Sequence, residues 1–202
     1  MVAVCTGAGP GPGGSDEVEE VGGMRTVVAY VLVSVDGVAQ DPEEFVLEFD
    51  EVMAANLAEV IGTQDTVLLG RRMYDEWSRH WPQSEDQPFA DFINSVRKLV
   101  ATSTPLTGEW AHAEAIPGPV EDFVRGLKAG EGLDVGVHGS LDLTRSLLAA
   151  GLVDELRLVV APRVVGTGRR LFEDGAGYSL ELVGCLNSPS GSLLVHYRVT
   201  GG

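Results

Sequence analysis

Basic residues are scarce in this chain of 202 residues. Lysine and arginine together number 14 against 30 aspartates and glutamates, so the formal net charge is −16 at pH 7. No stretch forms a basic stripe, and charge repulsion argues against nucleic acid or an anionic membrane as a partner. An anionic ligand would therefore need a local cluster of arginines that overcomes the mean field of the molecule.

Cysteines and long apolar runs are scarce as well. Cys5 and Cys185 lie far apart in the sequence, which suggests neither a disulfide framework nor a metal-binding cysteine pair. No cluster of histidine, cysteine and carboxylate predicts a metal site. No apolar run approaches the ~20 residues that cross a bilayer, and the chain does not start like a signal peptide. We therefore expect a cytoplasmic protein without a metal.

Residues 1–23 contain glycine, proline and acidic residues without an apolar period, which predicts a disordered leader. Their GAGPGPGG stretch resembles a dinucleotide-binding glycine loop. However, no strand precedes it and its prolines remove amide donors, so we reject that match. We expect a single folded domain over residues 24–202, which is long enough to bury a sizeable core.

Strand-like and helix-like segments alternate after the leader. The expected strands are 26–34, 66–69, 98–101, 134–137 and 155–161. The expected helices are 43–61, with Phe45 and Phe49 in its apolar stripe, 73–77, 119–128 and 141–148, the last capped by Ser140 or Asp142. Two final runs, 180–186 and 192–200, predict an antiparallel hairpin. The alternation predicts a three-layer α/β fold with a mostly parallel sheet and an antiparallel C-terminal hairpin.

Three predicted strands end in residues that suit phosphate. Gly70-Arg71, Thr102-Ser103 and Gly139-Ser140 each follow a strand directly. In open parallel sheets ligands bind beyond the carboxyl ends of the strands, where helix N-termini present amide groups and a positive dipole end. Any one of these turns at a strand end, taken alone, is well explained as an ordinary βαβ connection without a ligand. The coincidence of three at one edge favours an anion-binding rim.

Five segments resemble, in order, the dihydrofolate reductase fold and more closely the reductase domain of riboflavin biosynthesis, the RibD C-terminal domain. They are SVDG at 34–37, LLGRRMYDEW at 68–77, KLVATS at 98–103, GSLDLTRSLLAAGLVDEL at 139–156 and PRVVGTGRRLF at 162–172. The resemblance covers nearly everything from Met24 onward and implies a stand-alone, homodimeric member. It implies NADPH as the cofactor and hydride transfer to a small heterocyclic substrate, pterin-like or 5-amino-6-ribosylaminopyrimidine-like.

The resemblance also implies which residues hold the cofactor. Gly70 and Arg71 match the family's glycine–arginine turn, whose arginine contacts a cofactor phosphate, and Arg72 either assists or is a surface residue. The other matches are Thr102 and Ser103 near the adenosine 2′-phosphate, Val137, Gly139, Ser140 and Leu141 at the turn under the pyrophosphate, and Gly166 in a glycine loop that lines the cleft. For Arg169 and Arg170, which follow this loop, a solvated charged loop is the simpler account.

The substrate is expected between the SVDG turn and the first helix. Asp36, beside Gly37 in this turn, is the family's signature acid and our candidate catalytic and substrate-binding residue; alternatively, its carboxylate only bonds local backbone. Asp50 lies roughly where dihydrofolate reductases place their pterin-binding acid, or is a solvated helix residue. Trp77 either stacks on a substrate ring or packs in the core.

His138 departs from the family pattern. Riboflavin reductases usually carry a glutamate at this position, before the glycine turn, where it helps to hold the ribityl phosphate substrate. A histidine cannot accept hydrogen bonds through two oxygens, so His138 argues against that substrate. Alternatively, His138 is only a turn residue. The rival hypothesis for the whole chain is an NADP-binding module of the same fold without catalytic turnover.

Overall fold

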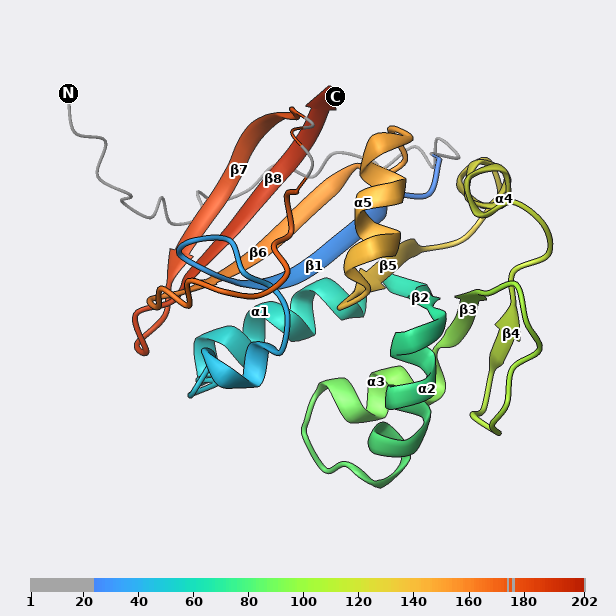
Figure 1. The fold of residues 1–202 in the computed structure, drawn as a ribbon, viewed down its shortest axis with the longest axis horizontal. Coiled ribbons are helices and arrows are strands. Elements are labelled where there is room, and N and C mark those ends of the chain that lie inside the picture. Colours follow the sequence, from blue (N-terminus) through green and yellow to red (C-terminus); the bar gives the residue numbers. More distant parts are fainter. Residues whose placement is uncertain (1–23, 174, 176, 202) are drawn as a thin grey trace, which may run out of the picture.

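The chain is organised around an eight-stranded sheet (Figure 1). The computed structural model describes residues 24–201 except 174 and 176, so the leader predicted for residues 1–23 lies outside the described residues. The strands are β1 Val27–Ser34, β2 Gln64–Gly70, β3 Arg97–Ala101, β4 Ala113–Ala115, β5 Asp134–His138, β6 Glu155–Ala161, β7 Ser179–Asn187 and β8 Leu193–Gly201. The helices are α1 Glu51–Gly62, α2 Arg71–His80, α3 Phe89–Ser95, α4 Val120–Lys128 and α5 Leu141–Ala149, with short 3₁₀ turns at Pro42–Glu44 and Trp81–Gln83.

The strand order is β4-β3-β2-β5-β1-β6-β8-β7. The first six strands in this order are parallel, whereas β8 runs antiparallel to β6 and pairs antiparallel with β7. The predicted mostly parallel sheet with an antiparallel C-terminal hairpin is therefore confirmed. The chain goes from β1 to β2, leaves one position open, and later fills it with β5. This strand order brings the carboxyl ends of β2, β3 and β5 side by side.

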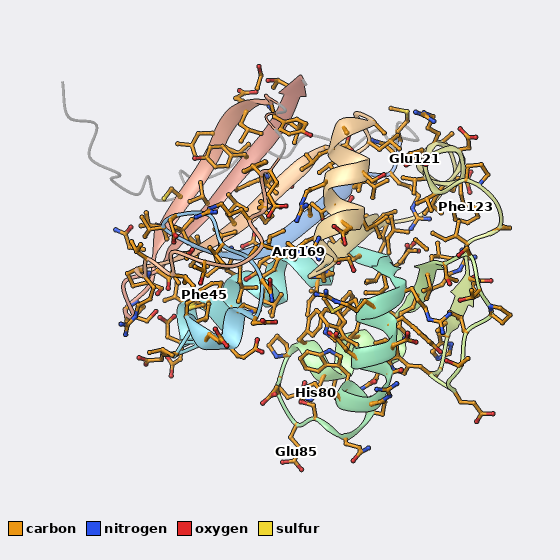
Figure 2. The ribbon with its side chains drawn as sticks, in the orientation of Figure 1. Phe45, His80, Glu85, Glu121, Phe123 and Arg169 are labelled. Carbon is orange, nitrogen blue, oxygen red and sulfur yellow. The ribbon has the colours of Figure 1, made fainter. Side chains whose placement is uncertain are left out.

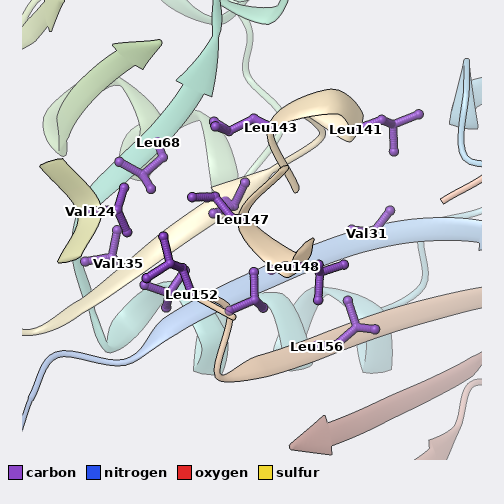
Figure 3. Close-up of a cluster of buried hydrophobic side chains, with 14 of the residues drawn as sticks. Val31, Leu68, Val124, Val135, Leu141, Leu143, Leu147, Leu148, Leu152 and Leu156 are labelled. Carbon is purple, nitrogen blue, oxygen red and sulfur yellow. The ribbon is translucent and has the colours of Figure 1, made fainter. Parts of the chain in front are cut away.

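Helices cover both faces of the sheet, which makes three layers (Figure 1). On one face, α4 and α5 pack against β1, β5 and β6, and α5 contributes Leu141, Leu143, Leu147 and Leu148 (Figure 3). On the other face, α1, α2 and α3 pack against residues of β1, β2, β3 and β6. Both faces of β1 are buried, which explains its almost continuous apolar sequence.

The helix predicted for 43–61 begins later than expected, at Glu51. The Asp50 carboxylate accepts hydrogen bonds from the amides of Val52 and Met53, and so caps the helix N-terminus. Phe45, labelled in Figure 2, precedes α1. It packs with Val38 and Ala161 in a separate cluster. The inclusion of Phe45 and Phe49 in the helical stripe was wrong, because a local cap outweighs the apolar spacing.

Two elements have no counterpart in the sequence prediction. Strand β4 has only three residues at the edge of the sheet, and α3 has seven. Such short elements contain too few residues to show a clear apolar period, and they depend on tertiary contacts. Within the described ranges, no helix is both long and apolar enough to span a membrane.

Candidate functional site

A pocket of about 240 Å³ lies at the carboxyl ends of β2, β3 and β5. Its lining consists of Gly70, Arg71, Arg72, Met73, Ala101, Gly139, Ser140, Leu141, Asp142, Leu143 and Arg169. The N-termini of α2 and α5 therefore both lie at this pocket, because Gly70 and Gly139-Ser140 directly precede these two helices. Thr102 follows Ala101 directly, so the third junction borders the same pocket.

The position of β2 brings the three junctions together. Gly70 is paired with Ala101 of β3, and Leu68 with Val137 of β5. The Gly70 amide donates a 3.0 Å hydrogen bond to the hydroxyl of Ser140. Ser140 therefore links the turn after β2 to the turn after β5. Ser140 is the N-cap residue of α5, as one of the two alternatives predicted, but its side chain makes no capping hydrogen bond to the helix.

Gly139 allows α2 to approach the turn after β5. Its φ of +65° favours glycine, and a Cβ here would lie 2.9 Å from Cε of Met73 and 3.2 Å from Cζ2 of Trp77. Trp77 itself makes edge-to-face contacts with the rings of Trp81 and Phe89. Trp77 is half-buried and packs against the apolar core, which agrees with the alternative that it is a core-packing residue.

Arg71 is held by many oxygen atoms around its guanidinium group. Its Nε donates to both carboxylate oxygens of Asp75 at 2.9 Å. Its Nη1 donates to Thr104 and Pro105 and, more weakly, to Thr102, and its Nη2 donates to Thr107. Arg71 and Thr102 thus lie side by side at the carboxyl ends of β2 and β3, where the sequence predicted both junctions. Arg71 therefore orders the segment after β3 at the rim of the pocket.

The pocket contains two further arginines. Arg72 is exposed and lies 3.6 Å from Glu76, one turn along α2. Arg169, labelled in Figure 2, comes from the loop after β6. It lines the pocket and pairs with Asp142. We had interpreted Arg169 as part of a solvated loop, and its place in the pocket wall corrects this. The available signal was the GTGRR sequence, which puts cations directly after a flexible glycine turn.

The Asp36 carboxylate joins two loops that are distant in sequence. It accepts hydrogen bonds from the Ser34 hydroxyl and from the amides of Val165 and Gly166, and lies 3.7 Å from Arg170. The Val165 amide, the Ser34 hydroxyl and the Gly166 amide lower the pKa of Asp36 to about 2. The group is thus ionised at neutral pH and is not a proton donor. Gly166 lies against Asp36, outside the pocket lining.

Asp50 also makes structural contacts. Besides capping α1, its carboxylate accepts a 3.0 Å hydrogen bond from the Ser190 amide in the turn between β7 and β8. Burial acts to raise the pKa of Asp50, but the hydrogen bonds from Ser190, Ser188 and Met53 outweigh it and the pKa is lowered. Asp50 therefore ties the first helix to the C-terminal hairpin.

His138 is the last residue of β5, which corrects the alternative that it is a turn residue. Its ring is buried among Tyr30, Phe89 and Phe92, and its Nε2 lies 2.8 Å from Oε1 of Gln64. Burial lowers the pKa of His138 to about 3, so the imidazole is neutral at physiological pH. A neutral, enclosed imidazole presents no charge to a substrate.

A family model described as the RibD C-terminal domain matches residues 25–194. The chain belongs to this family. It is 30% identical over 142 residues to the uncharacterized protein YyaP of Bacillus subtilis (strain 168), which covers 68% of this chain and 75% of the relative.

Solved structures of low sequence identity share the fold. A putative riboflavin biosynthesis protein from Shewanella sp. PV-4 is 15% identical with a TM-score of 0.70, covering 87% of this chain and 99% of that one. Dihydrofolate reductase from Enterococcus faecalis complexed with NADP(H) is 14% identical with a TM-score of 0.58, covering 87% and 96%. The predicted dihydrofolate reductase-like fold is confirmed, and the RibD C-terminal family is of reductase type.

The packing of α2 against Gly139 is testable with a matched glycine. Gly151 has a φ of +64°, but no atom lies within 4 Å of the Cβ that alanine would add. Gly139→Ala should therefore reduce the free energy of unfolding by about 1–3 kcal/mol more than Gly151→Ala, because only Gly139 adds overpacking to the backbone strain. Urea denaturation measures the difference. Equal losses would show that Met73 and Trp77 move aside without cost.

The lowered pKa of His138 predicts acid sensitivity. Below the ordinary histidine pKa the unfolded chain binds a proton that the folded protein excludes until about pH 3. Stability should therefore fall as pH decreases from 6.5, by up to about 1.4 kcal/mol per pH unit for this residue. His138→Gln should flatten this dependence, whereas the exposed control His80→Gln should not. Some slope remains from His196, whose pKa is also lowered.

The free energy of unfolding is measured by urea titration between about pH 5 and 7, because a histidine of the unfolded chain titrates in this range. A slope in His138→Gln as steep as in the parent protein would contradict the assignment.

Proposed function

We propose that this protein is an NADPH-dependent reductase that transfers a hydride to a small heterocyclic substrate. The observation that carries the proposal is the convergence of two helix N-termini and three arginines on one pocket. The first amides of a helix have no acceptor within it and attract anions, so the chemistry of this pocket suits phosphate. Membership of a reductase-type family and a fold shared with an NADP(H)-bound dihydrofolate reductase support the choice of ligand.

The size of the pocket limits which part of the cofactor it would enclose. Its 240 Å³ is below the ~300–1,000 Å³ of pockets that bury a whole drug-sized ligand. Gly70, Arg72, Gly139 and Leu141 would hold the phosphate groups here, while Thr102 and Ser103 would lie near the adenosine 2′-phosphate. When bound, NADPH would supply the hydride.

The residues of the protein would contribute to the reaction by positioning the substrate. We propose that ionised Asp36 holds the SVDG turn and the loop after β6 together beside the substrate, with Gly37 in the turn. The proton that accompanies the hydride would then come from water, since Asp36 is a carboxylate at neutral pH. The substrate classes remain a pterin-like or a 5-amino-6-ribosylaminopyrimidine-like compound, and the buried His138 argues against recognition of a ribityl phosphate at its position.

A second candidate is an NADP-binding module without turnover. One observation favours it: four residues that we had assigned to the substrate make structural contacts instead. Asp36 bonds loop amides, Asp50 caps a helix, Trp77 packs in the core and His138 bonds Gln64.

The two candidates are separated by binding and turnover measured on the purified protein. NADPH binding is measured by calorimetry, and oxidation of NADPH is followed by its absorbance with pterins, flavin precursors and cyclic imines. Oxidation with one class supports the reductase. Tight binding of NADPH without oxidation across the panel supports the module, and absence of binding contradicts both.

The role of Arg71 at the 2′-phosphate is tested with two cofactors. Arg71→Ala should weaken NADPH binding about 10-fold or more and NADH binding much less, because a hydrogen bond to a charged group contributes about 1.5–3 kcal/mol. Arg79→Ala, an exposed arginine at the other end of α2, is the control. Equal losses for both cofactors would show that Arg71 acts only through the segment after β3.

We also propose that the protein is a homodimer that uses the C-terminal hairpin. Leu182, Val183 and Leu186 are exposed on the edge strand β7. Leu182→Glu should shift the molecular mass measured by light scattering from that of a dimer to that of a monomer, because the charge would be desolvated in the interface. Leu133→Glu, at an exposed leucine outside the hairpin, should leave the mass unchanged. A monomeric parent protein would contradict the proposal.

A further inference from the structure

Each arginine of the pocket is already paired with an acid. Arg71 bonds Asp75, and Arg72 lies near Glu76. Arg169 pairs with Asp142, and Asp142 is the only acid in the pocket lining formed by the described residues. Three cations are thus compensated before a ligand arrives, and an anionic ligand must compete with carboxylates for them.

The Asp142–Arg169 pair can exchange partners more readily than the Arg71–Asp75 pair. Arg71 donates to Asp75 through Nε and to several oxygens after β3 through its other nitrogens, so its side chain is held in place. The Asp142 side chain is 75% exposed and that of Arg169 is 32% exposed. An exposed ion pair contributes little to stability, because water and salt screen it.

The backbone of Arg169 is fixed although its side chain is not. Its carbonyl accepts hydrogen bonds from the amides of Ala39 and Gln40, and its amide donates to the Gln40 side chain. The loop is also joined to α5 by the ion pair between Arg145 and Glu173. The guanidinium can therefore change partners by side-chain rotation alone, without movement of the loop.

Asp142 lies where a phosphate is expected to bind. It is in the first turn of α5, where the helix dipole and the amides attract negative charge, and it directly lines the pocket. Its carboxylate meets an arginine there, as a phosphate oxygen would. Asp142 thus places a negative charge, of the same sign as that of the expected ligand, at this position.

We propose that Asp142 is a built-in competitor of the cofactor phosphates, and that Arg169 exchanges the Asp142 carboxylate for a phosphate oxygen when the cofactor binds. This inference rests on the proposed function. Arg169 is then a cofactor-binding residue from the loop after β6, and Asp142 lowers the affinity for an anionic ligand. The same exchange applies to any ligand with a pyrophosphate group.

The control for Asp142 is Asp122, an acid in the first turn of another helix. Asp122 is in the first turn of α4, its side chain is 74% exposed, and it pairs with Arg125. Asp142→Asn and Asp122→Asn remove the same charge from equally exposed positions. Binding of NADPH and of inorganic pyrophosphate is measured by calorimetry for the parent protein, both variants, Arg169→Ala and the double variant with Asp142→Asn.

Asp142→Asn should tighten NADPH binding ~3- to 10-fold at low ionic strength, because it removes a competing charge at a helix N-terminus and frees Arg169. The gain should shrink at high salt. Asp122→Asn should have no effect. Arg169→Ala should weaken binding in the parent and in the Asp142→Asn background alike, because the guanidinium contacts the ligand itself.

Unchanged or weaker NADPH binding by Asp142→Asn would overturn the inference while leaving the proposed function intact. Loss of the Arg169→Ala effect in the Asp142→Asn background would also overturn it, since Arg169 would then only neutralise Asp142. Pyrophosphate binding with the expected ranking of variants, but without NADPH binding, would support the inference and contradict the proposed function. No binding of either ligand by any variant would overturn both.

Discussion

The parallel pairing of β2 with both β3 and β5 is the constraint on which the site depends. Parallel strands end at the same edge of a sheet, so this pairing alone brings Gly70, Ala101 and Gly139 together from segments about 30 residues apart or more. The hydrogen bond from the Gly70 amide to Ser140 then sets the distance between the two turns. Because both turns continue into helices, the same edge collects two helix N-termini and their amides.

Electrostatics in this molecule is local rather than global. The chain carries a net charge of −16, yet its pocket at the sheet edge contains three arginines. Two of them pair with acids on their own helix, one turn away, and Arg169 pairs with Asp142 across the pocket. Because each arginine is paired with an acid, the pocket contains three cations although the surrounding surface is not basic. In the exchange proposed for Arg169, an anionic ligand would replace a carboxylate instead of approaching an uncompensated negative field.

The sequence predicted most of the fold because its central elements have strong apolar patterns. Buried parallel strands such as β1 are apolar on both faces, and α5 repeats leucine at helical spacing. The start of α1 was missed because Phe45 and Phe49 fit the same spacing, although the Asp50 cap begins the helix at Glu51. Short β4 and α3 were missed because pairing and packing, and not local pattern, make them stable.

The sequence by itself determined the glycine junctions, the arginine after β2 and the family, because these depend on residue types at fixed spacings. Only the tertiary structure decided which side chains remain available at the site. Asp36 bonds a loop about 130 residues away, His138 is enclosed by aromatic rings, and Arg169 reaches the pocket from a distant loop. The physical reason is that a side chain's partners, and therefore its pKa and accessibility, come from segments that meet only when the sheet forms.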